Sequence, residues 1–79
     1  MHTAAVEEAL ARAALPEPAV RRAVREGAGV SQRSLARALG VSAQAVNFWE
    51  AGKRTPSARY VARYVSLLAQ LADVPEVIG

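Results

Sequence analysis

The sequence predicts an all-α protein, a compact bundle of about five helices. Ala, Arg and Leu, which favour helices, are plentiful, and runs of β-branched residues are absent. Pro, Gly and Ser residues divide the chain into short segments, and apolar residues recur in these segments with the spacing of one helix face. Because the chain has 79 residues, we expect a single domain, residues 1–79, with a modest core.

The first predicted helix covers about residues 4–14 and is an addition ahead of the remaining four. Thr3 is the expected N-cap, with Glu7 and Glu8 in the early turns, where acidic side chains are favourable. Pro16 ends the segment. Its thin apolar stripe consists of Val6, Leu10 and Ala13.

The second predicted helix starts at the second of two closely spaced prolines, Pro18, a residue suited to a first turn. It reaches about Glu26, and Gly27 and Gly29 stop it. Its expected apolar face consists of Ala19, Val20, Ala23 and Val24.

Two short helices are predicted in the centre of the chain, at about residues 32–39 and 43–51. Ser31 and Ser42 are their N-caps, and Gly40 supplies the left-handed residue of a sharp turn between them. Gly52 ends the second of the two. Their buried residues are expected to be Leu35, Ala36, Leu39, Val41, Val46 and Trp49.

The last predicted helix runs from a cap at Ser57 to about Ala72 and is closed by Pro75. The remainder, about residues 74–79, is expected to be a loose tail. The inward-facing residues are expected to be Val61, Tyr64, Val65, Leu68 and Leu71.

Positive charge is concentrated in the middle of the chain. Residues 1–30 are neutral, residues 31–64 carry six basic side chains against Glu50 alone, and residues 65–79 carry a charge of −2. Basic residues gathered in one segment suit a polyanion such as nucleic acid, although a solvated surface has the same composition.

Several function classes lack the residues that they need. Cysteine is absent and His2 is the one histidine, so neither a disulfide nor a zinc site is expected, and no cofactor is implied. No clustered carboxylate pair is available for acid–base catalysis, so we expect no enzyme and no small-molecule substrate. No apolar run is long enough for a membrane span or for the core of a signal peptide, which favours a cytoplasmic, nucleoid-associated protein.

The central segment QRSLARALGVSAQAVNFWE, residues 32–50, resembles the helix-turn-helix of phage repressors and Cro proteins, the lambda-repressor-like or XRE-type family. The continuation AGKRTPS, residues 51–57, also resembles that family. Ala36 is small where the two helices cross, Gly40 makes the turn and Ser42 caps the second helix. With its neighbouring helices the resemblance covers about residues 18–72, and the motif itself is residues 32–51.

The resemblance implies that the second helix of the motif lies in the major groove. Gln44 is the expected reader of a base, because its amide matches adenine, and Asn47 has similar chemistry with a shorter reach. The family often has a polar residue where Phe48 stands, and Phe48 is also suited to packing against the last helix or a dimer partner. The expected base-contacting residues are Ala43, Gln44, Asn47 and Phe48.

Contacts with phosphate are implied at the start of the motif and in the loop after it. Gln32 holds a phosphate and braces the reading helix in similar repressors, and the loop crosses the DNA backbone. The expected phosphate-contacting residues are Gln32, Arg33, Ser34, Arg37, Ser42, Lys53, Arg54 and Thr55.

The resemblance also implies a structural ion pair. In related repressors a Glu at the position of Glu50 pairs with an Arg at the position of Arg25, so we expect an Arg25–Glu50 salt bridge.

Three functions fit the motif: a small transcriptional regulator, an antitoxin-type protein that binds DNA and a toxin, and a module that binds only a protein partner. The first implies double-stranded DNA with a palindromic operator, and a homodimer. The helix carrying Val6 and Leu10 is one candidate dimer surface; another comprises Tyr60, Leu67 and the tail, residues 74–78.

Overall fold

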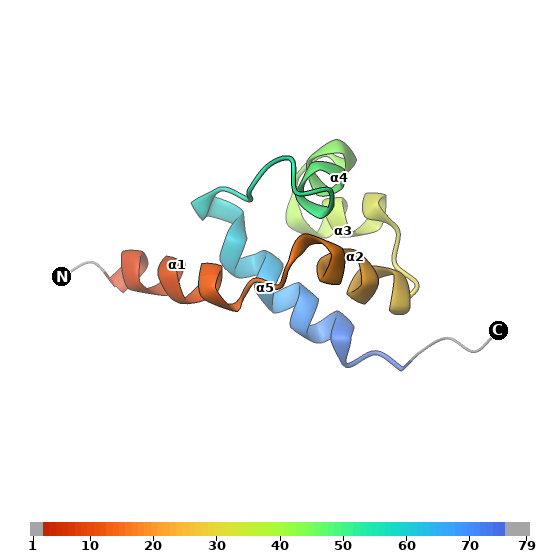
Figure 1. Cartoon of the computed structure of the whole chain (residues 1–79), viewed down its shortest axis with the longest axis horizontal. Coiled ribbons are helices and arrows are strands. Elements are labelled where there is room, and N and C mark those ends of the chain that lie inside the picture. The colour runs from red at the N-terminus through yellow and green to blue at the C-terminus, as the bar shows by residue number, and fades with distance from the viewer. Residues whose placement is uncertain (1–2, 76–79) are drawn as a thin grey trace.

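The computed structural model describes residues 3–75, and these form five α-helices (Figure 1). The predicted all-α fold is confirmed, and the described part of the chain contains no strand. No helix within it is long and apolar enough to cross a membrane. The helices are α1 (Thr3–Ala14), α2 (Pro18–Gly27), α3 (Gln32–Leu39), α4 (Ala43–Glu50) and α5 (Ala58–Ala72).

Side-chain caps fix the starts of α3 and α4. The hydroxyl of Ser31 accepts from the backbone N–H of Ser34 at 3.0 Å, and that of Ser42 accepts from Ala45 at 3.1 Å. Each cap satisfies one of the N–H groups that a helix start leaves without an intrahelical partner. The caps predicted at Ser31 and Ser42 are therefore confirmed.

A left-handed glycine makes the turn between α3 and α4. Gly40 has φ +73° and ψ 32°, and the N–H of Val41 reaches back to the carbonyl of Ala36 at 3.0 Å. This arrangement ends α3 within one residue and leaves Ser42 in place to start α4.

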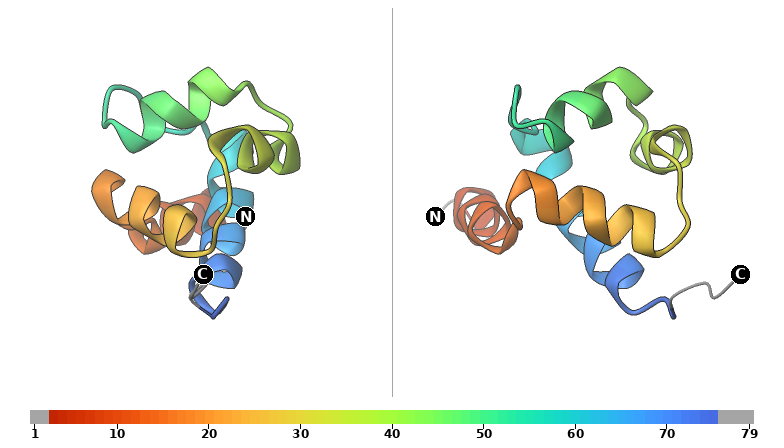
Figure 2. Two further views of the ribbon diagram at one scale, coloured as in Figure 1. Left: turned by 90° about the vertical axis from the view of Figure 1, so that its right-hand side faces the viewer. Right: turned by 45° about the vertical axis from the view of Figure 1, so that its right-hand side comes forward.

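The core lies where α3 and α4 meet α5. Helix α5 contacts α1, α2 and α3, and the two views in Figure 2 show α3 and α4 together on one side of α2 and α5. Trp49 packs against Tyr64 with their ring centroids 5.2 Å apart. The buried core cluster consists of Leu35, Ala36, Leu39, Val46, Trp49, Tyr64 and Leu68.

The predicted apolar stripe of α1 does not pack against the rest of the bundle. Val6 and Leu10 are 59% and 66% exposed, because α1 turns a different face toward α5. On that face Arg12 forms an ion pair with Glu8 at 2.9 Å and donates to the carbonyl of Pro56 at 3.0 Å. The hydrogen bond from Arg12 to Pro56 links α1 to the segment ahead of α5, and Figure 1 shows α1 at the side of the bundle.

The apolar face predicted for α2 is also wrong. Only Val24 of that set is partly buried, and Val20 is 47% exposed. The residues that α2 buries are Arg21 and Arg25, each less than 10% exposed. Their guanidinium groups find oxygen partners inside the fold, which makes burial of the two charges tolerable.

Some helix ends differ slightly from the prediction. Thr3 is the first helical residue of α1 and not a cap ahead of it, α2 continues to Gly27, and α4 ends at Glu50. Ser57 precedes α5 but its side chain makes no capping hydrogen bond. His2 and residues 76–79 of the predicted tail lie outside the described residues.

We predict opposite effects on stability from two Gly-to-Ala substitutions. Gly40→Ala should lower the free energy of unfolding by about 1–2 kcal/mol, because a side chain disfavours its left-handed backbone even though no atom lies within 4 Å of the new Cβ. Gly27→Ala also meets open space, in a helix, and should raise stability by about 0.5–1 kcal/mol. Denaturant unfolding of both variants tests this, and equal effects would contradict it.

Candidate nucleic-acid interface

Helix α4 presents one polar face to solvent. Val46 and Trp49 point into the core, so the residues on the opposite face are free of packing contacts with it. The exposed residues of that face are Ala43, Gln44 and Asn47. The structure therefore brings three of the four expected base-contacting residues to one accessible surface.

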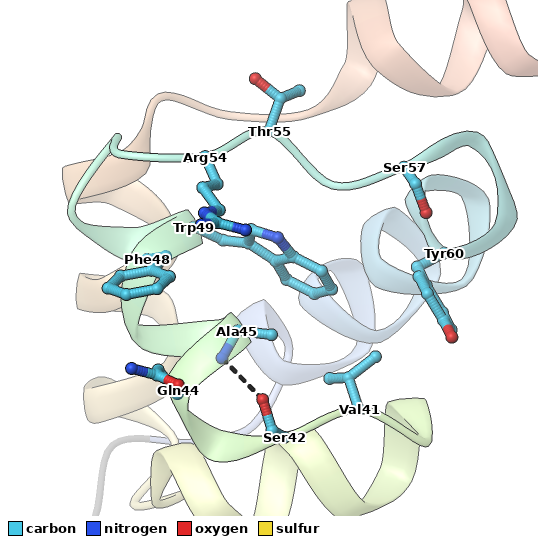
Figure 3. A pocket seen from close by; sticks show the side chains of 10 residues that line it. All are labelled: Val41, Ser42, Gln44, Ala45, Phe48, Trp49, Arg54, Thr55, Ser57 and Tyr60. Atoms are coloured by element: carbon cyan, nitrogen blue, oxygen red, sulfur yellow. Dashed lines mark hydrogen bonds between the residues drawn. The ribbon is translucent and has the colours of Figure 1, made fainter.

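Phe48, the fourth, is partly buried at the side of α4. It lines a groove of about 300 Å³ between α4, the loop that follows it and the start of α5 (Figure 3). Two cations lie over its ring: Arg54, with its guanidinium carbon 5.3 Å from the centroid, and Lys53, with its ammonium nitrogen at 6.0 Å. The groove is lined by Val41, Ser42, Gln44, Ala45, Phe48, Trp49, Arg54, Thr55, Ser57 and Tyr60.

The basic loop after α4 is exposed and begins at another left-handed glycine. Gly52 has φ +72°, and the N–H of Lys53 donates to the carbonyl of Phe48 at 2.9 Å. This reversal directs Lys53, Arg54 and Thr55 along the edge of α4, where all three side chains are exposed.

Helix α3 carries four of the other expected phosphate-contacting residues. Arg33, Ser34 and Arg37 are exposed, as an anion-binding role requires. Gln32 is different: it is partly buried, and its amide nitrogen donates to Glu50 at 3.0 Å. Its side chain thus joins α3 to α4 within the protein.

The Arg25–Glu50 ion pair expected from the sequence is present and buried. The guanidinium donates to both carboxylate oxygens, at 2.6 Å and 3.0 Å, and a third N–H donates to the carbonyl of Val30 at 2.7 Å. The hydrogen bond with Glu50 raises the pKa of Arg25, although burial opposes this. Glu50 accepts from Gln32 as well, so one carboxylate connects α2, α3 and α4.

Arg21 is a structural residue that the sequence analysis did not identify. It donates to the carbonyl of Pro16 at 2.6 Å and to that of Trp49, near the end of α4, at 3.0 Å. Its spacing of four residues from Arg25 places both on one face of α2, and that shared face is the signal that could have revealed its role.

Tyr64 lies beside this charged network without a hydrogen-bond partner. Its hydroxyl is buried, and its side chain is fully inaccessible to solvent. Burial, reinforced by the charge of Glu50, raises the pKa of Tyr64 to about 12, while Arg21 and Arg25 act in the opposite direction.

Comparison with known proteins agrees with this geometry. A family model described as helix-turn-helix matches residues 22–74. The chain belongs to the helix-turn-helix family. The match confirms the resemblance to lambda-repressor-like proteins and spans most of the range expected for it. A search of curated proteins and one of solved structures each find no match.

Membership of this helix-turn-helix family makes the chain a DNA-binding regulatory protein, with double-stranded DNA as its partner. The two helices of the motif are α3 and α4, joined by the turn at Gly40. The helix that lies second in the motif, α4, is the one that exposes a polar face.

We predict that Arg25→Ala lowers the free energy of unfolding by about 3–5 kcal/mol, because it leaves the carboxylate of Glu50 buried without its cation. The double variant Arg25→Met/Glu50→Leu removes both charges and should recover most of this loss. Arg22→Ala is the matched control, since its ion pair with Glu26 is exposed and should change stability by less than about 0.5 kcal/mol. Retention of full stability in Arg25→Ala would contradict a structural role for the pair.

We also predict a loss of stability at high pH that Tyr64→Phe removes. In the unfolded chain the hydroxyl ionises near its ordinary pKa of 10, whereas the folded state retains the proton to about 12. Stability is therefore complete below pH 10 and falls as the pH rises to 12, by roughly 3 kcal/mol. Unfolding of the wild type and Tyr64→Phe across this range measures the difference, and parallel curves would refute the prediction.

Proposed function

We propose that this protein is a sequence-specific transcriptional regulator of the Cro-like or repressor type, which reads the major groove with α4. The observation that carries the proposal is the exposed polar face of α4 beside an exposed basic loop. The Ser42 cap and the buried Arg25–Glu50 ion pair that hold α4 support it further, because a reading helix must be held in a fixed orientation.

Gln44 is the proposed reader of adenine. Its amide can donate to N7 and accept from N6 of adenine in a bidentate pair. Asn47 lies on the same exposed face, three residues further along α4, and suits either a base edge or a phosphate. Ala43 can pack against the methyl group of a thymine.

The proposed phosphate contacts flank α4 on two sides. Arg33, Ser34 and Arg37 on α3 supply one side, and Lys53 and Thr55 in the loop supply the other. Ser42 retains a hydroxyl hydrogen while it caps α4, and Gln32 retains a second amide hydrogen while it binds Glu50. Such contacts fix the position on the duplex and add affinity without sequence preference.

A homodimer on a palindromic operator follows from the size of the reading surface. One α4 helix covers about half of a two-fold site, and dimers of this class place two such helices roughly 34 Å apart, one turn of the duplex. We therefore propose that two copies bind two half-sites.

An antitoxin-type protein or another partner-binding module is the second candidate. The observation that favours it is the exposure of Val6, Leu10 and Val20 on α1 and α2, helices that lie outside the α3–α4 motif. A protein partner that covers these apolar side chains would be bound at the same time as DNA.

We predict that selection from a pool of random duplex DNA recovers a short palindromic site. Gln44→Ala should bind that site with reduced discrimination at one base pair, by about 1–3 kcal/mol, and should retain the wild-type salt dependence. The measurement is enrichment and affinity of both proteins across a salt series. Weak binding with no enriched site would contradict the proposal and favour the partner-binding candidate.

A further inference from the structure

We propose that Arg54 reads a guanine in the major groove, one or two base-pair steps from the base read by Gln44, and that Phe48 is the positioning residue that holds it there. The inference rests on the proposed function, since it adds a second reading residue to the same surface. It replaces the two roles expected from the sequence, a phosphate contact by Arg54 and a base contact by Phe48.

The first observation is the position of the Arg54 guanidinium over the ring of Phe48. The guanidinium carbon lies 5.3 Å from the ring centroid, within the range of a cation–π contact. A guanidinium stacked through its face keeps the N–H groups along its edge available. Among residues 3–75, Arg54 has no carboxylate within ion-pair distance and its side chain makes no hydrogen bond, so these donors are not already engaged by the protein.

The second observation is the place of this pair on the reading surface. Gln44 and Phe48 are one turn apart on α4, and both line the groove to which Arg54 also contributes (Figure 3). With α4 lying along the major groove, as proposed, the 5.4 Å advance of one helical turn corresponds to one or two base steps of about 3.4 Å, which is the separation of Gln44 and Phe48 on the DNA. The guanidinium held over Phe48 is therefore in register with the base pair after the one that Gln44 reads, or with the next.

The third observation is the chemistry of the pair. Phe48 has no hydrogen-bonding group and is partly buried by the groove, so it is better suited to support another side chain than to recognise a base edge. Arg54 offers the planar fork that matches O6 and N7 of guanine, the commonest specific contact in the major groove. Stacking removes part of the rotational freedom of this side chain before DNA arrives, which lowers the entropy lost on binding.

Lys53 provides a contrast within the same loop. Its ammonium is 6.0 Å from the ring, and it is a compact point charge without a fork. A phosphate contact needs only such a charge, whereas the planar group is the one placed closer to Phe48. In the loop, Lys53 therefore binds a phosphate and Arg54 binds a base.

The test is selection from random duplex DNA, followed by affinities for the enriched site and its single-base variants across a salt series. The proteins are the wild type, Arg54→Ala, Phe48→Leu, Phe48→Tyr and Lys53→Ala. Arg54→Ala should lose a roughly 5- to 150-fold preference for guanine at one position and retain the preference associated with Gln44. Phe48→Leu should lower the same guanine preference, and Phe48→Tyr, which keeps the ring, should retain it.

The control and the contrary results separate the possible outcomes. Lys53→Ala should weaken binding to all sequences alike and reduce the salt slope by about 0.9. The same uniform loss in Arg54→Ala would show a phosphate contact and overturn the inference, and an unchanged guanine preference in Phe48→Leu would overturn the positioning role. A wild-type protein that enriches no site would refute the proposed function itself, and this inference with it.

Discussion

The arrangement of the motif depends on the carboxylate of Glu50, which links three helices. It lies at the end of α4 and binds Arg25 of α2 through two hydrogen bonds and Gln32 of α3 through a third. Apolar packing alone is tolerant of small rotations, whereas a buried charge pair requires defined distances and directions. We infer that the hydrogen bonds of Glu50 fix the angle at which α4 projects from the bundle. Arg21 adds a second attachment through the carbonyl of Trp49.

The motif could be predicted well because each of its landmarks acts locally. Ser31 and Ser42 each accept from the N–H three residues ahead, and Gly40 can adopt the left-handed backbone of the turn without steric cost. These contacts lie within a few residues of the chain, so they can be predicted from the local sequence. The spacing of the large apolar residues by three or four positions in α3, α4 and α5 also matches the core that forms.

The two N-terminal helices could not be predicted as well, because their packing depends on partners distant in sequence. A hydrophobic pattern assigns Val20 to the core and Arg21 to solvent, but the carbonyl of Trp49 makes burial of the arginine favourable. In α1 the contact of Arg12 with the carbonyl of Pro56 turns Val6 and its neighbours outward. Stacking of Arg54 on Phe48 was missed for the same reason, since the fold of the loop brings them together.

We propose that DNA is bound by the outer face of α4 with the loop beside it. The most direct measurement is an NMR titration of the whole chain with the enriched duplex, following every backbone amide. We expect the largest shifts along α4, at the start of α3 and through the loop at residues 52–55, with few changes on the face of α1 that carries Val6 and Leu10. Shifts centred on α1 and α2, with α4 unaffected, would contradict it.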